Sequence, residues 1–169
     1  MAFTVQDDTG TVEDANAYID VAYFESYCDD RGLDYSAYDS TQKEQAIVRG
    51  TAYLDQKFDW SGWKLNGYSQ TTEHPRDGVY CYGDKIEGIA REVKKSTAEY
   101  AFRSLSDALA PDQADKNGLI TKTKKKVDVI EKEITYQEGS QSGYISYPTA
   151  DNIINSSCLI DDSNQAIRN

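Results

Sequence analysis

The sequence has few of the residues on which catalysis and covalent cross-linking usually depend. Its 169 residues include one histidine, one methionine, three prolines and three cysteines. Cys28, Cys81 and Cys158 lie far apart and are odd in number, whereas a disulfide framework or a zinc site needs pairs or close spacing. We therefore expect reduced thiols, as in a cytosolic protein.

Long apolar runs are also missing. Apolar residues make up 38% of the chain, and no run reaches the length of about 18 residues that a membrane-spanning helix needs. The N-terminus, MAFTVQDDTG, lacks the basic and apolar regions of a signal peptide. We expect no membrane partner. The chain is nevertheless rich in tyrosine, with 13 residues, and tyrosines can fill a core or an interface while their hydroxyl groups stay hydrated.

Basic residues are scarce at the start of the chain. The net charge is −11, and the first thirty residues carry eight acids and no Lys or Arg. Proteins that bind DNA gain affinity when Lys and Arg neutralise phosphates, so this chain as a whole should repel DNA. Two interpretations stay open, a solvated acidic surface and an acidic wall beside which DNA slides without binding.

The one basic cluster is KTKKK, residues 122–126. It could contact nucleic acid, or it could pair with an acidic neighbour such as the first thirty residues of another copy. It could also be a solvated strand face that prevents edge-to-edge aggregation.

Recognisable catalytic motifs are absent. The sequence has no phosphate-binding loop, dinucleotide fingerprint, zinc-protease motif or nucleophile elbow, and DDTGTVED lacks the spacing of a calcium loop. His74 could act as a general base, but nothing points to a nucleophile and an orienting acid beside it. We expect no enzyme activity, no catalytic residues, no cofactor and no metal.

The hydrophobic pattern predicts a mainly α fold. Asp20 can cap a first helix that ends before Gly32. TQKE, residues 41–44, matches a capping box for a second helix with Ile47, Thr51, Leu54 and Phe58 on one face. Residues 72–88 contain turn signals, and the longest helical pattern follows them and ends before Pro111.

Beyond Gly118 the pattern changes to that of β-strands. Residues 119–137 are rich in β-branched residues that alternate with charges, which indicates a ribbon. Pro148 suits the first turn of a short last helix. We predict a small helical bundle of three main helices with an extended β-ribbon arm and a short C-terminal helix. The predicted division is an N-terminal extended segment (1–14), a helical core (15–117), a β-rich arm (118–145), and a C-terminal helix and tail (146–169).

A two-stranded ribbon is marginal in water and becomes stable when it packs on something else. Strand addition between chains is one such arrangement, and head-to-tail contacts can close into rings. We therefore expect assembly rather than catalysis. The candidate interface residues are Lys122, Lys124, Lys125, Lys126, Val127, Val129, Ile134, Tyr136, Tyr144, Tyr147, Ile153 and Ile154.

Four stretches, in this order, carry a resemblance to a known family. They are DANAYIDVAYFESYCDDRG, TQKEQAIVRGTAYLDQKF, HPRDGV followed by IEGIAREVKKSTAEYAF, and KVDVIEKEITYQEG followed by YPTADNII. In them the chain resembles the head–tail connector (adaptor) proteins of tailed bacteriophages, some relatives of which carry the label "putative DnaT-like single-stranded-DNA-binding protein".

The resemblance implies a structural protein of the virion neck, assembled in the host cytoplasm. It also implies that residues 72–88 are a shaped connector between helices, with Arg76 and Asp77 as candidate pairing groups. It implies a homo-oligomeric ring of about twelve copies between the portal protein and the tail or neck proteins, through which DNA passes during genome ejection without specific binding. The alternative hypothesis is a single-stranded DNA-binding replication protein. Such proteins combine a basic groove with stacking aromatic side chains, and here the tyrosines fit but the charge does not.

Overall fold

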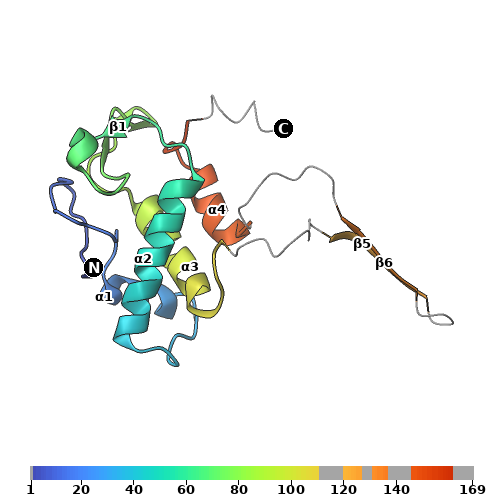
Figure 1. Cartoon of the computed structure of the whole chain (residues 1–169). Helices are drawn as coiled ribbons and strands as arrows, with labels where there is room; N and C mark the ends of the chain where they lie inside the picture. The colour runs from blue at the N-terminus through green and yellow to red at the C-terminus, as the bar shows by residue number, and fades with distance from the viewer. Residues whose placement is uncertain (1, 111–119, 127–130, 137–145, 162–169) are drawn as a thin grey trace. The chain divides into compact units, whose positions relative to one another are not determined.

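The computed structural model describes residues 2–110, 120–126, 131–136 and 146–161 (Figure 1). The chain forms two compact units, one made of Met1–Leu109 and Ser146–Asn169 and the other of Ala110–Ile145. The first unit contains four helices and small antiparallel sheets, so the fold is mainly α. The C-terminal helix belongs to the same unit as the helical core, and the second unit begins at Ala110, upstream of the boundary that the sequence predicts at residue 118.

The first helix, α1 (Val21–Asp29), begins where the sequence predicts it. The carboxylate of Asp20 accepts a hydrogen bond of 2.7 Å from the backbone N–H of Tyr23, which satisfies an amide that the helix itself leaves unpaired. Gly32 follows the helix with a φ of +62°, a left-handed conformation that glycine adopts without strain.

The second helix, α2 (Ser40–Lys57), is capped two residues earlier than predicted. Asp39 accepts a hydrogen bond from the backbone N–H of Gln42 at 2.8 Å, and the Gln42 side chain accepts one from the backbone N–H of Asp39 at 2.9 Å. This is a capping box, and it places Thr41 inside the first turn. The prediction of a cap at Thr41 is therefore wrong, because an equivalent pattern with an acidic cap stands just upstream of it.

The third helix, α3 (Arg91–Ser106), packs most extensively against α2. A Cβ atom on Gly50 of α2 would lie 2.8 Å from the backbone nitrogen of Ala101, so only glycine permits this close approach. Val93, Thr97 and Tyr100 of α3 are buried, as the periodicity predicts.

The last helix, α4 (Pro148–Asn155), lies against α3, with Pro148 in its first turn as predicted. The Ser96 hydroxyl on α3 donates a hydrogen bond of 3.1 Å to the carbonyl oxygen of Ala150, and Ile154 is fully buried. The core thus lies between the four helices, and its largest fully buried side chains include Tyr18, Phe24, Ile47, Leu54, Val93, Tyr100 and Ile154.

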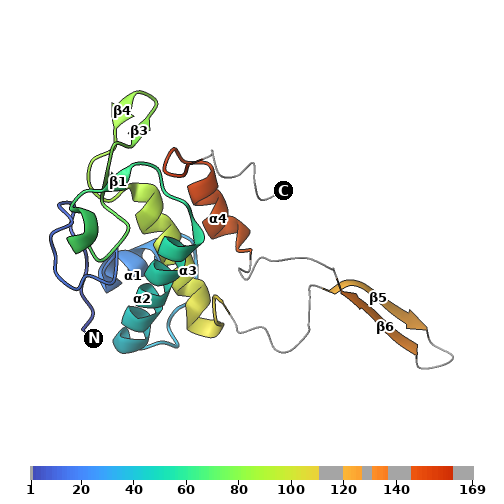
Figure 2. The ribbon, with the colours of Figure 1, turned by 45° about the horizontal axis from the view of Figure 1, so that its top comes forward.

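Residues 60–86, between α2 and α3, form what we call the aromatic lobe. It contains β1 (Trp63–Lys64) paired antiparallel with β2 (Arg76–Asp77), a 3-10 turn (Gly67–Ser69), and β3 (Tyr80–Cys81) paired antiparallel with β4 (Asp84–Lys85). Figure 2 shows the β3–β4 hairpin extending from the lobe away from the helices. The resemblance implies a shaped connector over residues 72–88, and the structure shows short strands and turns in this part of the lobe.

The second unit contains a two-stranded antiparallel ribbon, β5 (Ile120–Lys126) and β6 (Glu131–Tyr136). The register places Lys124 opposite Glu133 and Lys126 opposite Glu131. This confirms the predicted ribbon near residues 119–137. Val127, Val129 and Tyr144, three of the candidate interface residues, lie outside the described residues.

The expectation of three reduced thiols is wrong for two of them. Cys81 of β3 and Cys158, which follows α4, form a disulfide across a sequence separation of 77 residues, and their Cα atoms are 5.4 Å apart. Only the fold brings these residues together, so their spacing in the sequence gives no hint of the bond. Cys28 is a buried free thiol on α1.

Candidate nucleic-acid interface

The aromatic lobe exposes a group of large rings. Among the residues that the structure describes, every exposed large hydrophobic side chain lies between residues 63 and 82. Trp63 is 62% exposed, Tyr68 is fully exposed, Tyr80 is 62% exposed and Tyr82 is 98% exposed. The other aromatic residues of the first unit are buried or half-buried, so this concentration of rings on one lobe is a specific feature.

Trp63 is held in place by the backbone beneath its ring. A Cβ atom on Gly78 would lie 2.6 Å from the Trp63 ring, so the indole rests directly on a glycine that has a φ of +75°. The β1–β2 pairing places Trp63 opposite Asp77, next to that glycine. With one part of the ring supported and much of it exposed, Trp63 forms a fixed platform for a flat partner.

Tyr82 stands at the tip of the β3–β4 hairpin. Tyr82 and Gly83 have φ values of +52° and +94°, as a two-residue hairpin turn with a right-handed strand twist requires. Tyrosine is rarely found in this left-handed conformation, which costs of order 1–3 kcal/mol for a residue other than glycine. The hairpin tolerates this cost and presents the ring almost entirely to solvent.

Arg76 fixes the base of the lobe. Its guanidinium donates hydrogen bonds of 2.7 Å to the carbonyl oxygens of Ser61 and Gly62 and forms a 2.7 Å ion pair with Glu73. The candidate loop pairing residues therefore have partners within the lobe, since Asp77 pairs with Lys85 at 2.8 Å. The hydrogen bond from Lys85 lowers the pKa of Asp77.

His74 lies beneath the lobe and supports it. Its ring packs edge-on against Trp60, with ring centroids 4.5 Å apart, and against Tyr18. Burial lowers the pKa of His74 to about 3, with a further contribution from Arg76, so the imidazole is neutral at physiological pH. The residue is 2% exposed, and its ring packs inside the support of the lobe.

Asp55 is part of the same support. Its carboxylate accepts a 2.5 Å hydrogen bond from the Tyr18 hydroxyl and one of 3.2 Å from the backbone N–H of Glu73. The Tyr18 hydroxyl also accepts a hydrogen bond of 3.0 Å from the backbone N–H of His74. Burial raises the pKa of Asp55 to about 7 despite these bonds. The network joins α2 to the loop that carries Arg76.

A hollow of about 760 Å³ lies beside two of the exposed rings. It is lined by residues that include Trp63, Lys64, Tyr68, Gln70 and Arg76. Gln70 is buried and donates hydrogen bonds to the carbonyl oxygens of Thr72 and Pro75, so it holds the loop. Glu73 also lines the hollow and pairs with both Lys64 and Arg76. The hollow thus offers aromatic faces beside paired charges, and such faces suit stacking without selection among bases.

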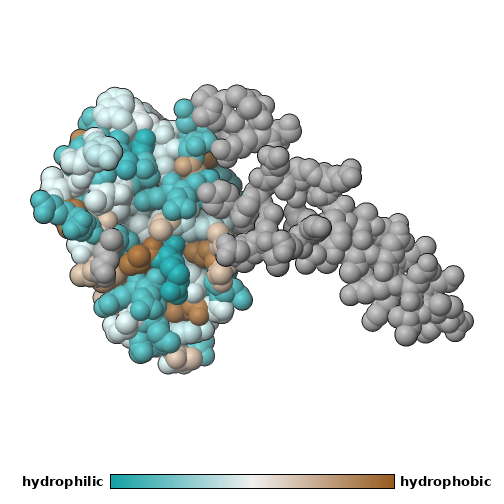
Figure 3. All heavy atoms as spheres, viewed as in Figure 1, coloured by the Kyte–Doolittle hydropathy of each residue, from teal (hydrophilic) through white to brown (hydrophobic). Residues whose placement is uncertain are grey.

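The lobe is not acidic, unlike the chain as a whole. Residues 60–86 contain three bases and three acids, whereas the whole chain has a net charge of −11. Residues 87–95, which follow the lobe, add three bases and two acids, and Arg91 pairs with Glu92 at 2.6 Å. In Figure 3 the part of the surface over the lobe is mostly white and teal, because Tyr and Trp have low hydropathy, so the exposed rings form no brown patch. The N-terminal loop with Asp7 and Asp8 contacts the lobe, since Asn66 donates a 2.7 Å hydrogen bond to the carbonyl oxygen of Thr9. The rings therefore lie on a neutral lobe with acidic groups nearby.

The candidate interface residues of the sequence analysis lie elsewhere. Ile154 is fully buried in its own chain, Ile153 is half-buried, and the Tyr147 hydroxyl is within hydrogen-bonding distance of the carbonyl oxygen of Leu109 at 3.4 Å. The buried Ile154 is therefore not available to a partner, because α4 packs on α3. Lys122, Lys124, Lys125 and Lys126 lie on β5, and Ile134 and Tyr136 lie on β6.

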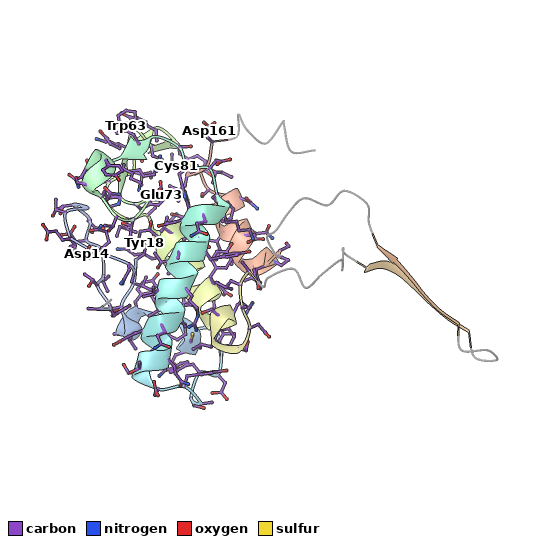
Figure 4. All side chains as sticks on the ribbon, viewed as in Figure 1. Asp14, Tyr18, Trp63, Glu73, Cys81 and Asp161 are labelled. Carbon is purple, nitrogen blue, oxygen red and sulfur yellow. A yellow bond between two sulfur atoms is a disulfide. The ribbon has the colours of Figure 1, made fainter. Side chains whose placement is uncertain are left out.

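The sequence analysis missed the exposed rings. Figure 4 labels Trp63 and Cys81, which lie with Glu73 at the end of the first unit beyond the C-terminal end of α2. One signal was present in DWSGWKLNGYSQ, where aromatic residues alternate with glycine and polar residues. Trp60 of this segment packs on His74, whereas Trp63 and Tyr68 stay exposed, so the pattern alone does not tell which rings are buried.

Other kinds of site find no support in the described residues. These residues contain no group of three or more His, Cys, Asp or Glu that could hold a metal ion. None of their helices is both long enough and apolar enough to cross a membrane.

Comparison with known proteins gives one match. A family model described as "Putative DnaT-like ssDNA binding protein" matches residues 1–168. No curated protein and no solved structure matches the chain.

The match overturns the leading expectation. It contradicts the hypothesis of a bacteriophage head–tail connector, with its virion, neck and genome-ejection roles, and supports the alternative of single-stranded DNA binding. The ring of copies, the portal and tail partners and the location in a virion were inferred from that hypothesis, and they stay untested predictions. The chain belongs to the family described as "Putative DnaT-like ssDNA binding protein".

Proposed function

We propose that this protein binds single-stranded DNA and that the bases stack on the exposed rings of the aromatic lobe. The observation that carries the proposal is the concentration of Trp63, Tyr68, Tyr80 and Tyr82 on one lobe without net charge. Stacking on aromatic side chains is the part of single-strand recognition that tolerates any sequence, because every base has a flat face. The family to which the chain belongs supports the same function. We propose a binding protein and not an enzyme.

The balance of charges on the lobe determines how strongly DNA binding should depend on salt. Each stacked base contributes about 1–3 kcal/mol, so two or three stacked bases can give measurable affinity without a basic groove. Electrostatic attraction contributes little, since Lys64 and Lys85 pair with Glu73 and Asp77. We therefore expect a weak dependence on salt, with a slope of log K against log salt of magnitude below about 2, which corresponds to at most three neutralised phosphates.

The experiment measures fluorescence anisotropy of a labelled oligothymidine of about 20 nucleotides, a length that exceeds the site size of one small domain. The wild type should bind the single strand at least tenfold more tightly than a duplex of equal length, because paired bases do not expose their faces. Trp63→Ala should weaken binding by about 5- to 150-fold, the loss of one stacked base.

Tyr38→Ala is the matched control. Tyr38 is a half-exposed tyrosine just before α2, whereas the lobe follows the C-terminal end of that helix. The 18 residues of α2 separate the two by about 27 Å, at 1.5 Å per residue. This variant should bind like the wild type. Equal losses in both variants, or no binding of the single strand by the wild type, would refute the proposed function.

A further inference from the structure

The β3–β4 hairpin carries Tyr80 and Tyr82, two of the four exposed rings. The ion pair of Lys85 with Asp77 links it to β2, but these side chains are 45% and 31% exposed, and such a pair contributes little. Each of its strands has two residues, and a hairpin of this size is marginal in water. At its base the backbone N–H of Ile86 donates a 2.9 Å hydrogen bond to the carbonyl oxygen of Val79, and Val79 is buried. Toward the tip, a Cβ atom on Gly83 would meet no atom within 4 Å.

The disulfide joins this hairpin to a segment that is itself well anchored. Cys158 follows α4 and precedes Leu159, which is 3% exposed. The carbonyl oxygen of Leu159 accepts a 2.8 Å hydrogen bond from the backbone N–H of Ser61, and Ile160 pairs with Trp60. The segment after α4 therefore holds both the start of the lobe, through backbone pairing, and the hairpin, through the disulfide.

The disulfide is within reach of a reagent from solution. Cys81 and Cys158 are half-buried, and both line a hollow of about 500 Å³ between the hairpin, the start of α3 and the end of α4. The Cys28 thiol does not exchange with the disulfide, because it stays protonated. Burial, together with the negative charge of Glu99, raises its pKa to about 12. Exchange at this bond thus depends on a thiol from outside the chain.

We propose that the Cys81–Cys158 disulfide is a reversible latch, and that its reduction by a dithiol releases the β3–β4 hairpin and weakens the binding of single-stranded DNA. This inference rests on the proposed function. In the oxidised protein the hairpin is fixed before DNA binds. In the reduced protein binding must order the hairpin, and the loss of its conformational entropy opposes binding.

The reaction is an ordinary dithiol–disulfide exchange. A thiolate of the dithiol attacks one sulfur of the Cys81–Cys158 bond, forms a mixed disulfide and releases the other cysteine as a thiolate, which takes up a proton. The second thiol of the reagent then displaces the remaining cysteine. In sum, two electrons and two protons pass from the dithiol to the protein, which gains two thiols, and the dithiol becomes a disulfide.

The test compares the oxidised full-length protein with the same protein after treatment with dithiothreitol. Hydrogen exchange followed by mass spectrometry should show faster exchange in residues 79–86 after reduction, with no change in α2 and α3. Anisotropy with the labelled oligothymidine should show affinity about 5- to 50-fold weaker after reduction, the cost of ordering the backbone of one or two residues. Cys81→Ser and Cys158→Ser should each match the reduced wild type, and Cys28→Ser should keep the full response to the reagent.

The outcomes separate the latch from the proposed function. Equal affinity of the oxidised and reduced proteins for the oligonucleotide overturns the latch but leaves the proposed function intact. Reduction that unfolds the helices also overturns it, because the disulfide is then a structural cross-link. Unchanged exchange in residues 79–86 overturns it too. If neither redox form binds the oligonucleotide, the proposed function fails, and the regulation of DNA binding fails with it.

Discussion

The anchoring of α4 depends on a buried ion pair, and replacing Asp151 by alanine tests this. Lys57 Nζ lies 2.7 Å from Asp151 Oδ1, and the two side chains are only 12% and 11% exposed. The same carboxylate accepts a hydrogen bond from the Tyr100 hydroxyl and one of 3.0 Å from the backbone N–H of Tyr147. Four aromatic rings surround the ammonium group of Lys57 at 5.2–5.9 Å.

The expected loss of stability follows from the groups that Asp151→Ala leaves without a partner. A buried cation loses its carboxylate, which typically costs about 3–5 kcal/mol, and the Tyr100 hydroxyl loses its acceptor. The first unit has a size for which each kcal/mol shifts Tm by about 3–5 °C, so Tm should fall by roughly 10–20 °C.

Urea unfolding of the oxidised protein, followed by far-UV circular dichroism, measures the loss. Lys57→Met combined with Asp151→Leu should recover most of the stability, because apolar side chains can replace a buried ion pair. Lys85→Ala is the matched control, since Lys85 pairs with Asp77 at a similar 2.8 Å but the two side chains are 45% and 31% exposed. That variant should lose no more than about 1 kcal/mol. A loss below 1 kcal/mol in Asp151→Ala, or a double variant less stable than either single one, would refute this reasoning.

Three further predictions concern the support of the lobe, the Trp63 platform and the second unit. The folded-state pKa of Asp55 is about 7, well above the value in the unfolded chain. At a pH between these two pKa values the folded protein therefore binds one more proton than the unfolded chain. Relative to Asp55→Asn, the wild type should therefore lose up to about 4 kcal/mol of unfolding free energy as pH rises from about 4 to about 7. Urea unfolding across this range checks the prediction, and a difference independent of pH would contradict it. Gly78→Ala should weaken oligothymidine binding by about 5- to 50-fold, because the new Cβ displaces a stacking ring, whereas Gly32→Ala, at a similar φ of +62° in open space, should bind normally. Equal affinity of the Gly78 variant and the wild type would count against the platform. Replacing residues 111–144 by a short Gly-Ser linker should keep the Tm of the first unit within about 5 °C of that of the full chain, because closing a shorter loop costs little entropy. Loss of cooperative melting would show that the units depend on each other.

The local signals in the sequence predicted the helices well. Asp20 and Pro148 mark helix starts by chemistry that needs no tertiary contact, and the structure confirms both. The second helix shows the limit of such signals. Asp39 with Gln42 and Thr41 with Glu44 are equivalent patterns two residues apart, and only the helix register distinguishes them.

The functional surface could not be predicted in the same way. Thirteen tyrosines look alike in the sequence, and which of them are exposed depends on how residues 60–86 turn back on themselves. The disulfide is a similar case, because Cys81 and Cys158 meet only after α4 packs on α3. The net charge of −11 led us to expect that the chain repels DNA, but residues 60–86 contain equal numbers of acids and bases.

Quenching of Trp63 fluorescence by single-stranded DNA tests the central claim most directly. Trp60→Phe leaves Trp63 as the single tryptophan of the chain, and phenylalanine keeps an aromatic ring against His74. Titration of this variant with oligothymidine should quench the emission of the 62% exposed indole in step with the binding measured by anisotropy. Binding that leaves the Trp63 emission unchanged would show that the bases do not stack on this lobe, and would contradict the account.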